Sequence, residues 1–191
     1  MSKRYDPNQP RVPAGSSKGG QWAKRETAEK IYNTVIPHHI NEAVVSKTSV
    51  ETPNIGEKAT PYSKRGIEIE PRLKEYLDKL RSDGDYISGD SGSFSTNDVA
   101  ILTTETGGEF AVLTAGDKSF LVRGGEKSTT IPHDLIRKIE LQKGTFDFHS
   151  HPYIGDLMPS NSDIEMLLRF PWQRTSIIVD PYGNKNKING D

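Results

Sequence analysis

Apolar residues at spacings of three and four positions predict three helices after residue 66. Each helix opens at a proline or at a Pro-Ser pair, which is typical of a first helical turn. The residues expected to face inward are Leu73, Tyr76, Leu77 and Leu80 after Pro71; Leu135, Ile136 and Ile139 after Pro132; and Ile164, Leu167 and Leu168 after Pro159-Ser160.

Short runs of β-forming residues between glycine-containing turns predict strands. These runs are residues 99–103, 109–114, 119–123, 145–150 and 175–180, and the second and third are expected to form a hairpin. Residues 84–92, with three glycines, are expected to be a loop. Helices and strands in this order predict an α/β fold in which helices pack on a mixed β-sheet.

The first 30 residues differ in composition from the rest of the chain. They carry seven Lys or Arg and three Asp or Glu, a net charge of +4, and since the whole chain is at −1 the remainder carries −5. They contain three prolines, a Gly/Ser-rich run and few apolar residues. We therefore expect a flexible basic arm at 1–30, a linker with a possible short helix at 31–65, and a folded domain at 66–191.

Composition also excludes several classes of protein. The chain has 191 residues and no cysteine, so disulfide scaffolds, thiolate zinc sites and cysteine nucleophiles are excluded. No apolar run is long enough for a membrane span, and the polar start lacks the hydrophobic core of a classical secretion signal. A net charge of −1 argues against specific nucleic-acid binding driven by bulk charge.

The candidate chemistry lies between Phe146 and Asp163. Side chains alternate along a strand, so His149 and His151 are expected to project from one face, with Phe146 and Phe148 on the other. Asp163, in the first turn of the next helix, could supply a third ligand to a zinc ion that keeps one position for water. Taken alone, Ser160 and Asp163 are also typical of an ordinary helix N-terminus.

The combined pattern, His149-Ser-His151-Pro, a loop, then Ser160-x-x-Asp163, resembles the JAMM/MPN family of zinc metallopeptidases, in the branch of RadC-like proteins and bacterial and phage JAB domains. The resemblance covers about residues 66–183 and implies a cytidine-deaminase-like fold. The loop of eight residues between His151 and Ser160 is one longer than is usual in the family.

The resemblance also implies an upstream glutamate as general base. Glu109, which opens a predicted strand after two glycines, is the preferred candidate, and Glu105 is its main competitor. Glu126 and Glu140 are further alternatives. Asp147 is expected on the histidine face, where it could orient a ligand histidine or remain solvated.

These assignments predict a hydrolase that cleaves a peptide or isopeptide bond. Zn²⁺ on His149, His151 and Asp163 would activate a water, Glu109 would move its proton, and Ser160 would donate a hydrogen bond to the oxyanion. By resemblance, the substrate is a protein or peptide, possibly with a ubiquitin-like tail. Phosphoesterases of the PHP type are excluded because no histidine follows Asp163, and a non-catalytic MPN-type scaffold stays open as the alternative.

The N-terminal arm resembles a short segment of tailed-phage head proteins and prophage-linked effectors. The residues that carry this resemblance are 8–16 and the run Gly19-Gly20-Gln21-Trp22, with Trp22 as the natural anchor. It implies phage head proteins as partners, and a location in the bacterial cytoplasm or the phage virion.

Overall fold

The computed structural model describes residues 54–189, so the expected arm and most of the expected linker lie outside the described residues. Within this part of the chain no helix combines the length and the apolar character needed to cross a membrane. The helices are the 3-10 turn η2 (Ser63–Arg65), α2 (Pro71–Lys79), α3 (Thr96–Thr106), α4 (His133–Leu141) and α5 (Asn161–Arg169). The strands are β1 (Tyr86–Asp90), β2 (Phe110–Ala115), β3 (Lys118–Arg123), β4 (Thr145–Ser150), β5 (Thr175–Val179) and β6 (Lys185–Asn189).

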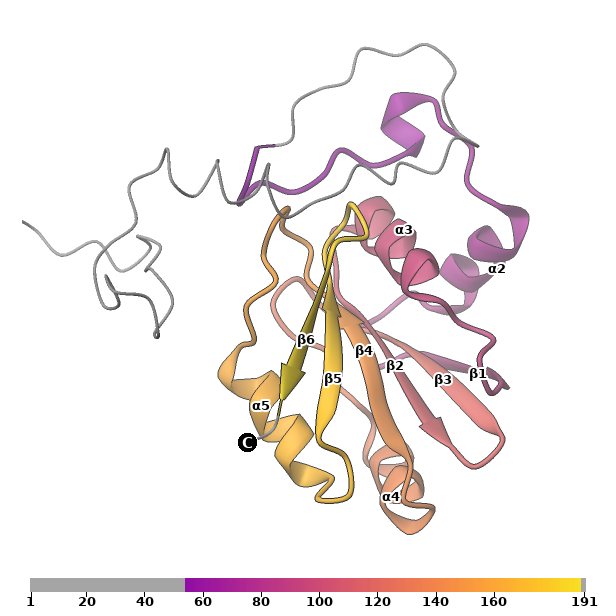
Figure 1. Ribbon diagram of the computed structural model, residues 1–191. Coiled ribbons are helices and arrows are strands. Elements are labelled where there is room, and N and C mark those ends of the chain that lie inside the picture. Colours follow the sequence, from indigo (N-terminus) through magenta and orange to yellow (C-terminus); the bar gives the residue numbers. More distant parts are fainter. Residues whose placement is uncertain (1–53, 190–191) are drawn as a thin grey trace, which may run out of the picture. The chain divides into compact units, whose positions relative to one another are not determined.

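The six strands form one mixed sheet, which confirms the predicted α/β class. Their order is β1-β3-β2-β4-β5-β6, and Figure 1 shows them as a fan with β6 at one edge and β1 at the other. The pair β4–β5 is parallel, and the remaining pairs are antiparallel, including the predicted β2–β3 hairpin. The parallel pair is connected through α5, so the end of β4 and the start of α5 belong to one crossover.

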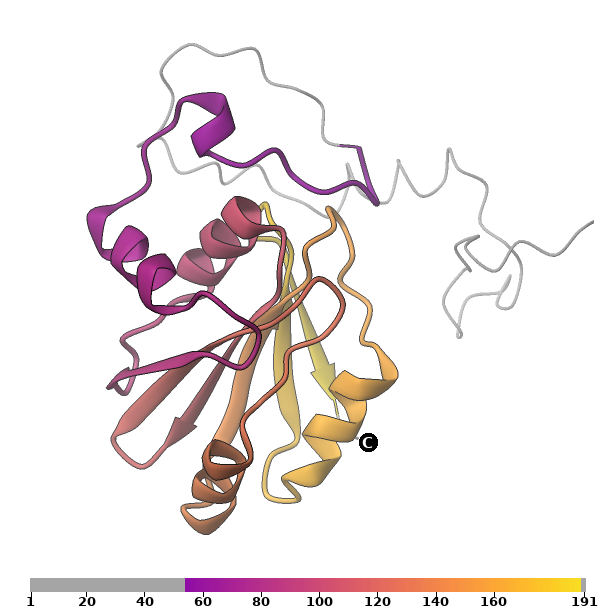
Figure 2. The ribbon, with the colours of Figure 1, turned by 180° about the vertical axis from the view of Figure 1, so that it is seen from behind.

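Helices contribute to two main apolar clusters, one on each face of the sheet. On one face, Leu135 and Ile139 of α4 pack with Ala111 and Leu113 of β2. On the other, α2 and α3 pack against β2 and β3 in a cluster of Leu73, Leu80, Phe94, Val99, Leu102, Phe110, Val112 and Leu121. The reverse view in Figure 2 shows α5 beside β5 and β6, where Leu167 meets Ile178 and Ile188.

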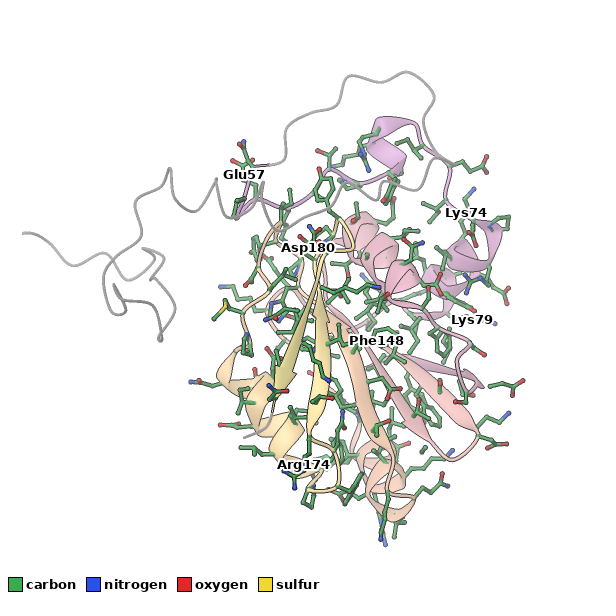
Figure 3. The ribbon with its side chains drawn as sticks, in the orientation of Figure 1. Glu57, Lys74, Lys79, Phe148, Arg174 and Asp180 are labelled. Carbon is green, nitrogen blue, oxygen red and sulfur yellow. The ribbon has the colours of Figure 1, made fainter. Side chains whose placement is uncertain are left out.

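A bulge in β4 changes the expected alternation of its side chains. Leu113 and Val112 of β2 are adjacent, yet they pair with Phe146 and Phe148, so the β4 side has one extra residue. Phe146 therefore lies in the α4-side cluster, whereas Phe148, labelled in Figure 3, packs against the α2–α3 cluster. The expectation that both phenylalanines share one face is wrong because it assumed an unbroken period of two.

Residues 99–103 form part of a helix, so the strand predicted there is wrong. Ser95 and Asp98 form a capping box at the start of α3, and Gly107, with φ of 68°, ends the helix. The β-forming residues of α3 are buried around most of its circumference, so they show no amphipathic period. In the sequence, the signals for this helix were the Ser95-x-x-Asp98 pair at its start and Gly107 at its end.

The two edge strands were not predicted. Tyr86–Asp90, expected as a loop, pairs along its length with β3 as the edge strand β1. At the opposite edge, β6 is polar, with Lys185 and Lys187 exposed, and pairs with β5. Both strands bury little, so apolar alternation could not reveal them. Leu168 is also exposed, contrary to expectation, because Leu167 takes the inward position.

Candidate metal centre

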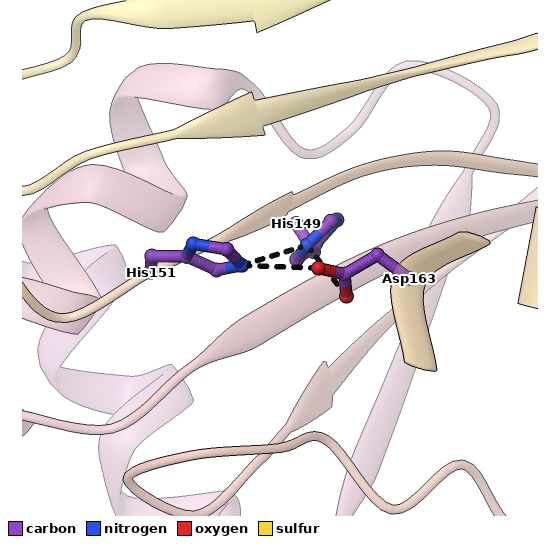
Figure 4. A group of neighbouring side chains, drawn as sticks. All are labelled: His149, His151 and Asp163. Atoms are coloured by element: carbon purple, nitrogen blue, oxygen red, sulfur yellow. Dashed lines mark hydrogen bonds and ion pairs between the residues drawn. The ribbon is translucent and has the colours of Figure 1, made fainter. Parts of the chain in front are cut away.

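Three predicted ligands converge where β4 ends and α5 begins. Figure 4 shows the imidazoles of His149 and His151 facing the carboxylate of Asp163. Their Nε2 atoms are 3.2 Å apart. His149 Nε2 lies 3.0 Å from Asp163 Oδ1, and His151 Nε2 lies 3.4 Å from Asp163 Oδ2. All three residues are buried.

Neighbouring residues of β4 fix the histidine side chains. Ser150, between the two histidines, is fully buried, and its hydroxyl contacts that of Thr103 in α3 and accepts a hydrogen bond from the Phe110 amide at 2.9 Å. The ring of Phe146 stacks on His149 with centroids 5.2 Å apart. The bulge is what brings Phe146 to the histidine face, so the local irregularity of β4 serves the site.

A capping box positions Asp163 at the start of α5. The Ser160 hydroxyl accepts from the Asp163 amide at 3.2 Å, and the Ser160 amide donates to Asp163 Oδ2 at 2.7 Å. The Ser160 hydroxyl also lies 2.7 Å from Oδ2, where it can donate to the carboxylate. Ser160 is therefore engaged with Asp163, and its hydroxyl would have to leave that contact to reach an oxyanion.

Charge pairing dominates the electrostatics of the ligand cluster. Burial alone would lower the pKa of His151, but the carboxylates of Asp156 and Asp163 outweigh it and raise that pKa to about 10. Burial alone would raise the pKa of Asp163, but hydrogen bonds with His149 and His151 bring it well below its usual range. In the metal-free protein, a proton is thus retained where the three donors meet.

Glu109 is a buried carboxylate whose protonation is coupled to this cluster. It precedes β2, is 7% exposed, and accepts a hydrogen bond from the Thr129 hydroxyl at 3.2 Å. Burial raises the pKa of Glu109 to about 7, while the charge of His151 lowers it and that of Asp163 raises it. A group with this pKa can both take up and release a proton near neutral pH.

The other glutamates considered as the general base interact with residues outside the ligand cluster. Glu105 accepts a hydrogen bond from the Ser63 amide at 3.1 Å. Glu126 pairs with Lys58 at 3.1 Å and accepts from the Tyr153 hydroxyl, and Glu140 pairs with Arg169 across α4 and α5.

Asp147 lies on the face opposite His149, contrary to expectation. Its carboxylate accepts hydrogen bonds from the hydroxyls of Thr114 and Thr145, and it lines a hollow on that face beside Phe148 and Ile177. The bulge is again the reason, because the register of β4 shifts at this point.

The three side chains could together hold a metal ion, and their spacing can be compared with that of a tetrahedral zinc site. Zinc–ligand bonds of about 2.0–2.1 Å at tetrahedral angles put neighbouring donor atoms about 3.3 Å apart. Here the two Nε2 atoms are 3.2 Å apart and His149 Nε2 lies 3.0 Å from Asp163 Oδ1; with one ligand atom taken from each residue, all three lie within 4.8 Å of one another. Nε2 is the atom that each ring directs at the cluster, and among the described residues the buried Nδ1 atoms of His149 and His151 have no hydrogen-bond partner.

Sequence reasoning missed two acidic residues beside the site. Asp156, in the loop between His151 and Ser160, lies 3.5 Å from His151 Nδ1. Asp180, after β5, is fully buried and accepts a hydrogen bond from the Gly155 amide at 3.0 Å. The extra residue in this loop was a sequence signal that the loop could contribute to the site. Its conformation could not be predicted, because it depends on contacts distant in sequence.

Comparison with known proteins identifies no relative of this chain. No family model, curated protein or solved structure matches this chain. The functional interpretation therefore rests on the motif residues and their geometry.

Proposed function

We propose that this protein is a zinc-dependent hydrolase that cleaves a peptide or isopeptide bond, with a JAMM/MPN-type site. The observation that carries the proposal is the convergence of His149, His151 and Asp163, whose ligand atoms lie within 4.8 Å of one another. The substrate class, a protein or peptide with or without a ubiquitin-like tail, comes from the motif resemblance.

His149, His151 and Asp163 would hold the ion. Bound Zn²⁺ would polarise the scissile carbonyl and lower the pKa of a water molecule. Glu109 would accept a proton from the attacking water and deliver it to the leaving amine, as its pKa of about 7 allows. Its burial keeps bulk water from competing for that proton.

Ser160 has a positioning role in this proposal. Its amide and hydroxyl both lie 2.7 Å from Asp163 Oδ2, which fixes the carboxylate and leaves Oδ1 directed at His149. Oxyanion stabilisation by Ser160 stays a prediction, and it would require the hydroxyl to turn away from Asp163 during the reaction.

Metal analysis of the purified chain tests the proposed centre. We expect about one zinc ion per wild-type chain and a sharp loss in Asp163→Ala. Asp117→Ala is the matched control, because Asp117 is an exposed acidic residue of the β2–β3 turn. Equal, near-zero zinc in the wild type and Asp163→Ala would refute the proposal.

Turnover of a panel of peptide and isopeptide substrates separates an enzyme from a scaffold. Glu109→Gln should retain zinc and lose turnover, while Glu105→Gln, four residues away, should keep both. Zinc binding without turnover by the wild type on any substrate would favour the MPN-type scaffold. Unchanged turnover in Glu109→Gln would remove Glu109 as the base.

A further inference from the structure

His151 has a buried nitrogen that the proposed zinc site does not use. If Nε2 binds the ion, neutral imidazole carries its proton on Nδ1, and that proton needs an acceptor. Nδ1 of His151 is buried and makes no hydrogen bond within the described chain. The acidic oxygen beside it is Asp156 Oδ2 at 3.5 Å, about half an ångström longer than a typical N–H···O hydrogen bond.

The loop that carries Asp156 is fastened at the two residues before it. The Gly155 amide donates to the buried carboxylate of Asp180, labelled at the β5–β6 turn in Figure 3. Asp180 in turn accepts from the amides of Tyr182 and Asn184, each at 2.9 Å. The loop backbone at Asp156 is therefore tied to the sheet.

A second set of contacts, with residues 56 and 57, holds the same loop at Ile154. The Gly56 amide donates to the Ile154 carbonyl at 2.8 Å, and the Ile154 amide donates to the Glu57 carbonyl at 2.9 Å. The Asp156 side chain remains half exposed, and within residues 54–189 it makes no other contact that would hold it away from His151. The backbone is fixed while the carboxylate has room to move the short distance to Nδ1.

We propose that Asp156 is a positioning residue that accepts a hydrogen bond from Nδ1–H of His151 and thereby directs Nε2 of that ring to the metal. This inference rests on the proposed function, since it assigns a partner to one of the proposed ligands. A carboxylate behind a ligand histidine fixes the tautomer and the orientation of the ring and raises its basicity. His149 is held differently, by stacking on Phe146.

Competition with a chromophoric zinc chelator measures the effect. Asp156→Ala should weaken zinc binding by about 10- to 100-fold, the usual effect of removing such a partner. Asp156→Asn should weaken it less, because the amide oxygen still accepts from Nδ1–H. Asp117→Ala is the matched control and should bind as the wild type does. Circular dichroism and thermal unfolding of each variant check that the chain is folded.

Imidazole ¹⁵N NMR of the zinc-free chain provides a readout that is independent of metal. The Nδ1 resonance of His151 should move in Asp156→Ala, while that of His149 should not. Zinc affinity equal to wild type in Asp156→Ala, with zinc lost in Asp163→Ala, would overturn this inference and leave the proposed function standing. If the wild type bound no zinc, the proposed function would fail, and the NMR comparison would still accept or reject the contact between Asp156 and His151.

Discussion

Replacing Glu109 by glutamine should stabilise the metal-free protein in alkaline solution relative to the wild type. Glu109 is 7% exposed, and burial raises its pKa from 4.5 to about 7. Glutamine has nearly the same shape and can still accept the hydrogen bond from Thr129, but it cannot ionise. The substitution thus removes the cost of a buried charge with little change in packing.

The sign and size of the effect follow from the difference in pKa. The folded chain binds the Glu109 proton more tightly than the unfolded chain, so the free energy of unfolding falls as the pH rises from 4.5 through 7. Ionising a carboxyl group whose pKa is raised to about 7 costs about 3 kcal/mol in the folded chain. The stability advantage of Glu109→Gln over the wild type should therefore grow by about 3 kcal/mol between pH 4.5 and about pH 8.

Urea denaturation in the presence of a chelator, at several pH values, measures this difference. Glu105→Gln is the control and should follow the wild type. Added zinc should reduce the advantage of Glu109→Gln, because a nearby cation favours the ionised carboxylate. An advantage that stays constant over this pH range would show that burial does not perturb Glu109, and its assignment as the base would lose its physical support.

Three further substitutions or deletions test other parts of the structure. Ser160→Ala should lower the free energy of unfolding by about 1 kcal/mol through loss of the helix cap and weaken zinc binding, whereas unchanged zinc affinity would show that Asp163 does not need Ser160. Ser150→Ala should cost about 1–3 kcal/mol in chemical denaturation, because the buried Phe110 amide loses its acceptor, and a neutral effect would contradict the described anchor of β4. Deleting residues 1–30 should abolish capture of phage head proteins in a pull-down, and equal capture by both chains would end that proposal.

Local signals were sufficient to predict much of the secondary structure. Prolines at helix starts and apolar spacing located α2, α4 and α5, and the glycine-containing turn located the β2–β3 hairpin. Failures occurred where burial removes periodicity, as in α3, or where a strand buries almost nothing, as in β1 and β6. The bulge in β4 depends on pairing with β2, a partner distant in sequence, so no local pattern could indicate it.

The metal-ligand candidates were predictable because both halves of the cluster have strong local patterns. A His-x-His pair at a strand end and a Ser-x-x-Asp capping box are readable from sequence, and the structure brings His149, His151 and Asp163 together. Asp156 could not be assigned in the same way. Its place beside His151 depends on the hydrogen bond of the loop to buried Asp180, which joins residues distant in sequence.

Asp163 links the start of a helix to the proposed ion. One carboxylate oxygen accepts from the Ser160 amide, and the other faces His149. An ion bound to this carboxylate would draw electron density from the same group that caps α5. The rate of amide hydrogen exchange in the first turn of α5 should therefore change when the metal ion binds. Metal binding could then be followed without any substrate.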